Sequence, residues 1–149
     1  MSISEDIDIN EIAAFQLQTI NQRYTKNRRQ LIEILLKTSK PITINQILKS
    51  DSKLAQSSVY RNLAVLEEAG LVVKIITNDD HAHYELAEHI LDQHHHIICS
   101  PCGEILDFHL SEKIEKALES SLKKIADDFG FSIDRHRLDL LGTCGECTE

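Results

Sequence analysis

The chain has 149 residues, of which 42% are apolar and 27% charged, as expected for a globular protein of one domain or two small ones. The net charge of −8 argues against a nucleic-acid partner, but its distribution does not: residues 21–78 carry ten Lys and Arg against four Asp and Glu, whereas residues 79–149 carry six against sixteen. This asymmetry indicates a basic module joined to an acidic one, although charge blocks are also common on solvated faces.

The compartment follows from two further features. No apolar run approaches the roughly 20 residues needed to cross a bilayer, and the acidic first twenty residues lack the basic start of a secretory signal. We therefore expect a cytoplasmic protein, in which the four cysteines are metal ligands or redox groups rather than structural disulfides.

Helical periodicity and turn residues predict the first half of the chain. Helices are expected at about 9–21, at 26–37 with Thr25 as N-cap, at 44–50 with Thr43 as N-cap, and from the N-cap Ser57 to the stop at Gly70. The segments LVVKIIT and HAHYELA, separated by the turn-like NDD, predict a two-stranded hairpin. The last three of these helices and the first strand of the hairpin lie inside the basic segment, and three short helices followed by a hairpin are the order of a winged helix-turn-helix.

The helix that follows Ser57 has two faces. Helical spacing turns one face to the core, with Val59, Leu63 and Leu66. Ser57, Tyr60 and Arg61 share a second face near the amino end, where a recognition helix contacts bases and phosphates. An amphipathic surface helix without a partner would show the same pattern.

The second half of the chain is expected to contain mainly strands and one long helix. HHHIICS and EILDFH are expected to be strands joined by a tight SPCG turn, followed by a helix at about 111–128 and a strand, FSIDRHRLDLLG. This order predicts an α+β protein with a small C-terminal α/β dimerisation domain. We place the winged-helix domain at 1–87, a hinge at 88–93 and the dimerisation and metal-binding domain at 94–149.

All four cysteines fall into two C-x-x-C pairs, Cys99 with Cys102 and Cys144 with Cys147. Two such pairs form a closed tetrahedral thiolate site, with Gly103 and Gly145 allowing tight turns. A redox pair is the alternative, but a thiol oxidoreductase needs only one pair. We favour structural zinc.

Strand alternation divides the histidines. His94 and His96 point to one face of their strand and His95 to the other. Two carboxylates, Glu85 and Asp107, lie on neighbouring strands of the first two, and this donor set suits Fe(II), Mn(II), Zn(II) or Co(II). On the opposite face, His95 is expected to meet a second set, Glu115 and His136. A single histidine is more often an ordinary core or surface residue.

Together these residues resemble the ferric uptake regulator (Fur) superfamily of metal-sensing repressors. The resemblance runs from about Tyr24 to Cys147 and rests on RYTKNRRQLIEIL, SSVYRNLAVLEEAGLV, YEL, HHHIICSPCGEILDF and HRLDLLGTCGEC, in that order. It implies a homodimer in which a regulatory metal closes two DNA-binding arms on a palindromic double-stranded operator.

The resemblance also implies residue roles. The structural zinc ligands are Cys99, Cys102, Cys144 and Cys147; the regulatory ligands are Glu85, His94, His96 and Asp107; the second metal site holds His95, Glu115 and His136. Tyr60 and Arg61 match the DNA-contacting pair, and Ser57, Ser58, Arg23 and Lys26 are the other expected DNA contacts.

Two positions depart from the family pattern. The second helix ends in TSKPIT, without the regulatory histidine of many relatives, so His81, His83 or water would complete that shell. Gln93 stands where a histidine often joins the second site, which is then weakened or recruits His89.

The expected function is a metal-dependent repressor of metal-homeostasis or oxidative-stress genes, with iron favoured as the regulatory ion. Zinc, manganese and peroxide sensing are alternatives within the family. A metallohydrolase and a zinc-storage protein are alternatives outside it, but the chain has no H-E-x-x-H motif, and neither would need the basic segment. We expect no enzymatic activity.

Overall fold

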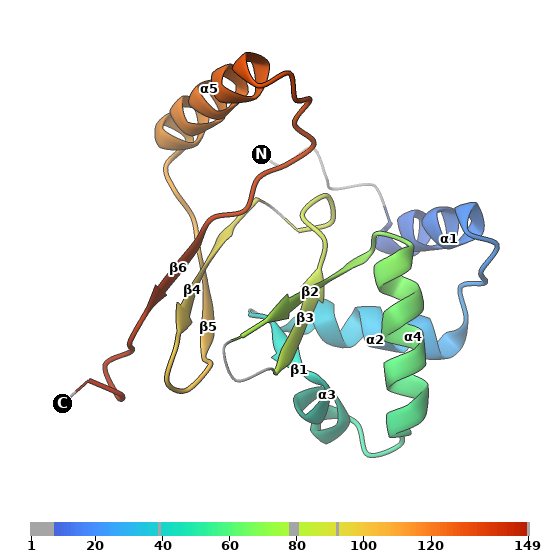
Figure 1. Ribbon diagram of the computed structural model, residues 1–149. Helices are drawn as coiled ribbons and strands as arrows, with labels where there is room; N and C mark the ends of the chain where they lie inside the picture. The colour runs from blue at the N-terminus through green and yellow to red at the C-terminus, as the bar shows by residue number, and fades with distance from the viewer. Residues whose placement is uncertain (1–7, 39, 78–80, 92, 149) are drawn as a thin grey trace. The chain divides into compact units, whose positions relative to one another are not determined.

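A computed structural model describes residues 8–38, 40–77, 81–91 and 93–148. The chain forms two compact units, which we call the first unit (Met1–Asp92) and the second unit (Gln93–Glu149). Each combines α-helix with a three-stranded sheet, so the protein is of mixed helix and sheet (Figure 1). No helix among the described residues has the length and apolar content that crossing a membrane requires.

The first unit consists of four helices and one small antiparallel sheet. Its elements in chain order are α1 (Ile9–Thr19), α2 (Lys26–Lys37), β1 (Ile42–Thr43), α3 (Ile44–Ser50), α4 (Gln56–Glu68), β2 (Val72–Ile76) and β3 (Ala82–Leu86). The predicted NDD turn lies outside the described residues. α1 ends at Thr19, slightly before the expected boundary.

The caps of α2 and α3 follow the sequence prediction. The Thr25 hydroxyl accepts a hydrogen bond from the Arg28 backbone N–H, and Thr43 forms a reciprocal capping box with Gln46. Both threonines therefore satisfy backbone donors that a helix start leaves unpaired.

The predicted start of α4 is wrong. The helix begins at Gln56 with Ala55 as N-cap, and no side chain caps it. Ser57 lies inside the first turn instead. The predicted stop at Gly70 is confirmed: with a φ of +78°, the glycine lets the Leu71 N–H reach the Leu66 carbonyl at 2.9 Å.

The sheet of the first unit has three strands rather than two. β3 pairs with β2 on one edge and with β1 on the other, in the order β1-β3-β2, and all pairs are antiparallel. β1 is only two residues long, so it carries no alternation that a sequence pattern reveals.

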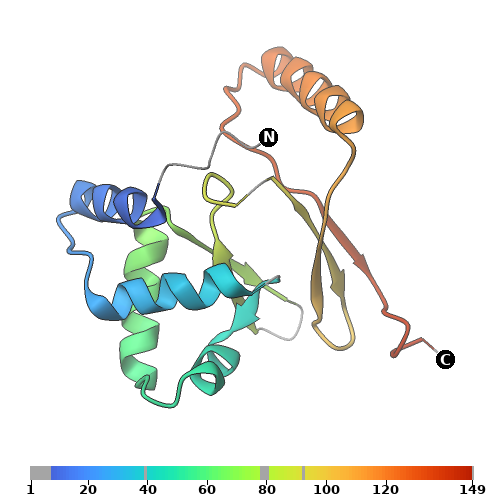
Figure 2. The ribbon, with the colours of Figure 1, turned by 180° about the vertical axis from the view of Figure 1, so that it is seen from behind.

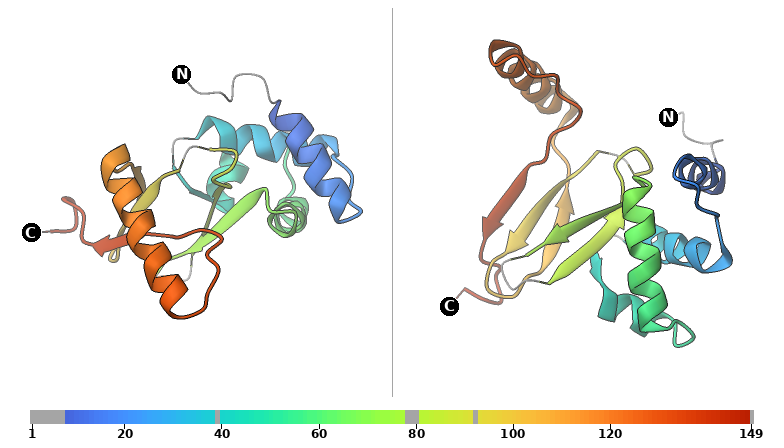
Figure 3. Two further views of the ribbon diagram at one scale, coloured as in Figure 1. Left: turned by 90° about the horizontal axis from the view of Figure 1, so that it is seen from above. Right: turned by 45° about the vertical axis from the view of Figure 1, so that its right-hand side comes forward.

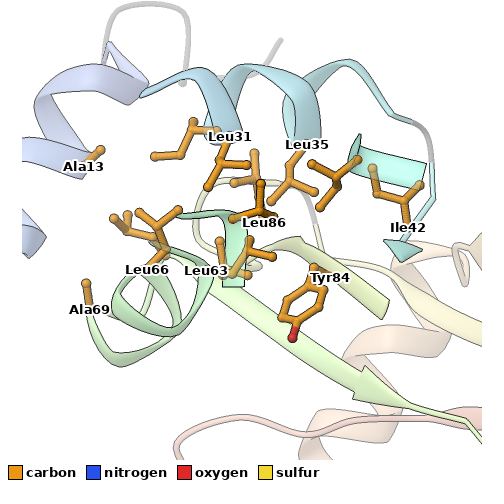
Figure 4. Packing of buried hydrophobic residues seen from close by; sticks show 14 of the residues in the cluster. Ala13, Leu31, Leu35, Ile42, Leu63, Leu66, Ala69, Tyr84 and Leu86 are labelled. Carbon is orange, nitrogen blue, oxygen red and sulfur yellow. The ribbon is translucent and has the colours of Figure 1, made fainter. Parts of the chain in front are cut away.

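One apolar core holds the first unit together (Figure 4). Leu31 and Leu35 of α2, Leu63 and Leu66 of α4, and Leu86 of β3 are each at most 2% exposed. The expected core face of α4 is therefore confirmed, and the opposite side of that helix stays in solvent.

A buried polar contact orients α4 against α2. Asn62 is 6% exposed; its Oδ1 accepts a hydrogen bond from Arg28 Nε at 3.0 Å, and its Nδ2 donates to Ser58 Oγ at 3.1 Å. A buried amide must be satisfied in this way, so the contact restricts the rotation of α4 about its axis. Tyr60 and Arg61 are thereby kept on the exposed side.

Among its described residues, the second unit contains the helix α5 and a mixed sheet (Figures 2 and 3). Its elements are β4 (His95–Cys99), β5 (Ile105–Phe108), α5 (Glu112–Asp128) and β6 (Asp139–Gly142). The strand order is β5-β4-β6, with β5 antiparallel and β6 parallel to the central strand β4.

The predicted last strand is too long. Only Asp139–Gly142 is strand, because β6 pairs with β4 alone and its ladder covers four residues, from His96 to Cys99. Residues 131–138 are outside that ladder and have no regular secondary structure.

We expect Leu63→Ala to lower the free energy of unfolding of the first unit by about 2–5 kcal/mol, because it removes a fully buried side chain and leaves a cavity. Tyr60→Ala, on the exposed side of the same helix, is the matched control and should change it by less than about 1 kcal/mol. Urea denaturation followed by circular dichroism measures both. Equal losses would contradict the assignment of the two faces.

Candidate metal centres

Four cysteine sulfurs gather at one end of the second unit's sheet. Cys99 ends β4, Cys102 lies in the turn that follows, and Cys144 and Cys147 lie just beyond β6. The parallel register that pairs Cys99 with Gly142 brings the two C-x-x-C segments together. All four sulfurs lie within 4.8 Å of one another.

The sulfur positions fit a zinc ion. A tetrahedral site with Zn–S bonds of about 2.3 Å places its sulfurs about 3.8 Å apart, and Cys102 Sγ and Cys144 Sγ are 3.9 Å apart. A disulfide would need about 2.05 Å, and all four cysteines are free thiols. The geometry therefore fits a thiolate metal site better than a redox disulfide.

The four thiols do not ionise alike. The Cys144 backbone N–H, 3.3 Å from Cys99 Sγ, is the main cause that lowers the pKa of Cys99 to about 6. A hydrogen bond with the Cys144 side chain is the main cause that raises the pKa of Cys147 to about 12. The pKa of Cys102 is also raised: the Glu104 backbone N–H lowers it, but the Cys99 side chain and burial together outweigh that contact. The pKa of Cys99 is thus lowered, whereas the pKa values of Cys102 and Cys147 are raised.

The two glycines of the C-x-x-C segments differ. Gly103 has a φ of +75°, a conformation that favours glycine, and its N–H donates to the Cys99 carbonyl at 2.8 Å. Gly145 has no such φ, and a Cβ there would meet nothing within 4 Å. The predicted need for glycine therefore holds at the first turn and is wrong at the second.

A second cluster contains His94, His96 and Asp107. His94 Nε2 is 3.8 Å from Asp107 Oδ2, and His96 Nε2 is 3.5 Å from Asp107 Oδ1. The two imidazoles meet edge to face with centroids 5.0 Å apart. Two imidazoles and one carboxylate, with their ligand atoms this close, fit a divalent transition-metal ion.

The other residues expected at the regulatory site belong to the first unit. Glu85 and His83 lie on β3, and His81 directly precedes that strand. Tyr84 and Leu86 belong to the core, so alternation turns Glu85 and His83 to the opposite face of β3. Their part in binding metal stays a prediction.

The third cluster lies on the other face of β4. His95, only 2% exposed, directs Nε2 at Glu115 Oε1 of α5, and His136 Nε2 is 3.8 Å from Glu115 Oε2. Among the described groups, Glu115 Oε2 is buried and accepts no hydrogen bond. A buried carboxylate oxygen in this state is suited to a cation.

Gln93 and His89 occupy different surroundings. Gln93 Nε2 is 3.3 Å from His136 Nε2, so the amide stands beside the third cluster. His89 belongs to the first unit, where its Nε2 pairs with Gln16 Oε1 at 2.7 Å. The recruitment of His89 to the second site stays a prediction.

The residues expected to contact DNA lie on the surface of the first unit. Ser57, Tyr60, Arg61, Arg23 and Lys26 are exposed, and Ser58 is half-buried. A groove of about 800 Å³ runs beside this surface, and its lining includes Lys26, Arg29, Lys53 and Ser58. Arg29 and Lys53 were not predicted as contacts, although both lie in the basic segment.

Sequence patterns also missed Asp139. It stands directly beside His96 across the β4–β6 ladder. Only the observed register of β6 with β4 reveals this pairing, because the expected twelve-residue strand does not specify which of its residues faces His96.

Comparison with known proteins identifies the chain. Residues 19–141 match the ferric uptake regulator family. The chain belongs to that family. Fur-family proteins are metal-responsive transcriptional regulators, so the chain is a regulator, not a metallohydrolase or a storage protein.

Individual relatives agree with this assignment. The peroxide operon regulator of Bacillus subtilis is 30% identical over 89% of this chain and 91% of its own length. The ferric uptake regulation protein of Campylobacter jejuni is 31% identical over 84% of this chain and 79% of its own. The Helicobacter pylori ferric uptake regulator, at 24% identity, shares the fold with a TM-score of 0.70 over 93% of this chain and 91% of that one.

We expect zinc affinity of this Fur-family protein to fall steeply as the pH is lowered from about 8 to about 5. The pKa values of Cys102 and Cys147 are raised, so at neutral pH both thiols must lose a proton when zinc binds. Below about pH 6 Cys99 becomes protonated as well. Chelator competition across this range measures the affinity, and a pH-independent affinity would contradict the thiolate site.

Proposed function

We propose that the chain is an Fe(II)-responsive homodimeric repressor that acts in the cytoplasm on a palindromic double-stranded operator. The first unit would be its winged-helix DNA-binding domain and the second its dimerisation and metal-binding domain. The observation that carries the proposal is the cluster of His94, His96 and Asp107, which offers an ion three ligands on one face of β4.

Three ligands leave a transition-metal ion incomplete. Fe(II) and Mn(II) take up to about six donors, so further ligands must come from elsewhere in the chain or from water. Glu85 is the proposed fourth ligand, because it lies on β3 and faces away from the first unit's core. The ion would then be bound by one ligand from the first unit and three from the second.

This arrangement gives metal a way to control DNA binding. With Glu85 held to the ligands of the second unit, the first unit is restricted to the poses that place both recognition helices of a dimer in successive major grooves. Metal drives this change only through its higher affinity for that pose, and coupling of about 1–3 kcal/mol is typical.

The exposed side of α4 supports the DNA-binding role. Arg61 offers a fork suited to guanine or phosphate, and Tyr60, 53% exposed, offers a ring and a hydroxyl beside it. Lys26 and the other cations of the 800 Å³ groove supply positive charge for backbone phosphates.

The exposed apolar surface of the second unit supports a dimer. Only Ala126 of α5 is buried among the described residues, although the helix is strongly amphipathic. Ile114, Ile125, Phe129, Phe131 and Leu141 are all more than half exposed. Such a surface is typical of an interface between subunits.

Peroxide sensing is the second candidate within the family. The Bacillus subtilis relative is a peroxide operon regulator, and the CGEILDFH stretch with Asp107 resembles that branch. A titration of the metal-depleted dimer with Fe(II), Mn(II) and Zn(II), with and without peroxide, distinguishes the two. Loss of operator binding with peroxide in the Fe(II) form alone favours peroxide sensing.

We expect the double variant Glu85→Ala/His96→Ala to lose metal-dependent operator binding, because it removes one proposed ligand from each unit. Fluorescence anisotropy with an operator selected from a random duplex library measures binding with and without Fe(II). Structural zinc and the dimer should be retained, since neither residue belongs to the sulfur cluster.

Glu88→Ala is the matched control, since it removes a carboxylate from the segment after β3 without touching a candidate ligand. Its operator binding should respond to metal as the unaltered protein does. A double variant that still responds normally would show that the regulatory ion binds elsewhere.

We expect Arg61→Ala to weaken operator binding by about 1–3 kcal/mol and to relax sequence preference, as loss of a base contact does. Lys26→Ala should weaken binding about equally on all sequences and lower the salt dependence by about one ion. Titrations at several salt concentrations separate the two effects. If both variants behave alike, α4 does not read bases through Arg61.

A further inference from the structure

Three side chains form a row across the sheet of the second unit. The register pairs His96 of β4 directly with Asp107 of β5 on one side and with Asp139 of β6 on the other. Directly paired residues in adjacent strands project to the same face. The imidazole therefore stands between two carboxylates.

The two ring nitrogens of His96 face different carboxylates. Nε2 lies 3.5 Å from Asp107 Oδ1, on the side of the metal cluster, and Nδ1 lies 3.4 Å from Asp139 Oδ1. The second distance exceeds a usual N–H···O hydrogen bond by a few tenths of an ångström. A small movement of either side chain closes it.

Asp139 is itself oriented by a cation. Arg137 Nη2 donates a hydrogen bond to Asp139 Oδ2 at 3.1 Å, which leaves Oδ1 directed at His96. The side chain of Asp139 is 29% exposed and that of His96 only 9% exposed, so the carboxylate reaches the buried ring from the solvent side.

We propose that Asp139 is a positioning residue for the regulatory metal site. It accepts a hydrogen bond from the Nδ1–H of His96 and so holds the imidazole in the tautomer whose Nε2 lone pair faces Asp107 and His94. A ligating histidine needs one nitrogen free of its proton, and a partner at the other nitrogen selects that tautomer and fixes the ring. This inference rests on the proposed function, since it assigns Asp139 a part in the same site.

The geometry of the row also indicates that Asp139 does not bind the regulatory metal ion that His96 would bind. The two nitrogens of an imidazole point away from each other, so groups at Nδ1 and Nε2 cannot share one ion with that ring. Asp107 stands at the Nε2 side with His94, whereas Asp139 stands at the Nδ1 side. Asp139 therefore acts on the site through His96.

The test uses the full-length dimer with zinc in the sulfur site and no regulatory metal. Co(II) and Mn(II) affinities are measured by chelator competition, and the His96 tautomer by long-range ¹H–¹⁵N NMR of ¹⁵N-histidine-labelled protein. His96→Ala assigns the resonance. We expect Asp139→Ala to lower metal affinity about 10- to 100-fold and to shift the metal-free ring away from the Nδ1–H tautomer, with zinc content unchanged.

Three further variants make the result specific. Asp139→Asn keeps an acceptor oxygen of the same reach, so it should preserve the tautomer and lose less affinity than the alanine variant. Arg137→Gln should give a smaller loss, since it only loosens Asp139. Asp134→Ala, an exposed carboxylate outside β6, is the matched control and should change nothing.

The outcomes separate this inference from the proposed function. If unaltered protein binds Co(II) no better than the His96→Ala variant, the proposed function fails. The comparison of His96 tautomers then still tests whether Asp139 orients the His96 ring. If His96→Ala loses metal but Asp139→Ala retains both affinity and tautomer, the inference alone is overturned. Should Asp139→Ala lose zinc or fail to fold, the metal affinity of Asp139→Asn decides: a lower affinity than that of Asp134→Ala, with zinc and the Nδ1–H tautomer retained, supports the role, and an affinity equal to that of Asp134→Ala overturns it.

Discussion

The pairing of β4 along both of its edges is the constraint on which the second unit depends. β5 and β6 lock this five-residue strand into one register, antiparallel on one side and parallel on the other. A shift of one residue would exchange its two faces and move every histidine to the wrong side. The pairing thus places His95 on one face of the sheet and His94 and His96 on the other. At the far end of β4 it brings Cys99 close to Cys144 and Cys147.

The second unit has little apolar material with which to hold that register. Among its described residues, the buried apolar side chains are Ile98, Cys99, Ile105 and Ala126. Units this small commonly need a metal, disulfides or a partner chain to be stable. The sulfur cluster joins the end of β4 to the segment after β6. The exposed apolar side chains of α5 are where a second copy would add further burial.

The first unit is stabilised in a different way. Its core is continuous and apolar, and one buried amide, Asn62, adds rotational specificity to α4. The outer face of α4 lies outside this core and is exposed. The exposed face of α4 carries Arg61 and Tyr60, which suit DNA, and β3 carries Glu85 on the side away from the core. The proposed metal-controlled movement of one unit relative to the other requires two units that are each folded on their own.

Short-range chemistry made several features readable from the sequence alone. The threonine caps of α2 and α3, the glycine stop of α4 and its core face depend on neighbours within one or two helical turns, and the alternation of the histidine triplet depends only on strand geometry. The two C-x-x-C pairs could be recognised as a metal site from the spacing of their cysteines alone. Tertiary contacts decided the rest: β1 pairs with the edge of β3 that β2 does not occupy, β6 is only as long as its ladder with β4, and α4 starts two residues earlier than expected although Ala55 provides no cap. Asp139 became visible only through its register with His96, because pairing between distant strands is set by the whole sheet and leaves no periodic mark in either segment.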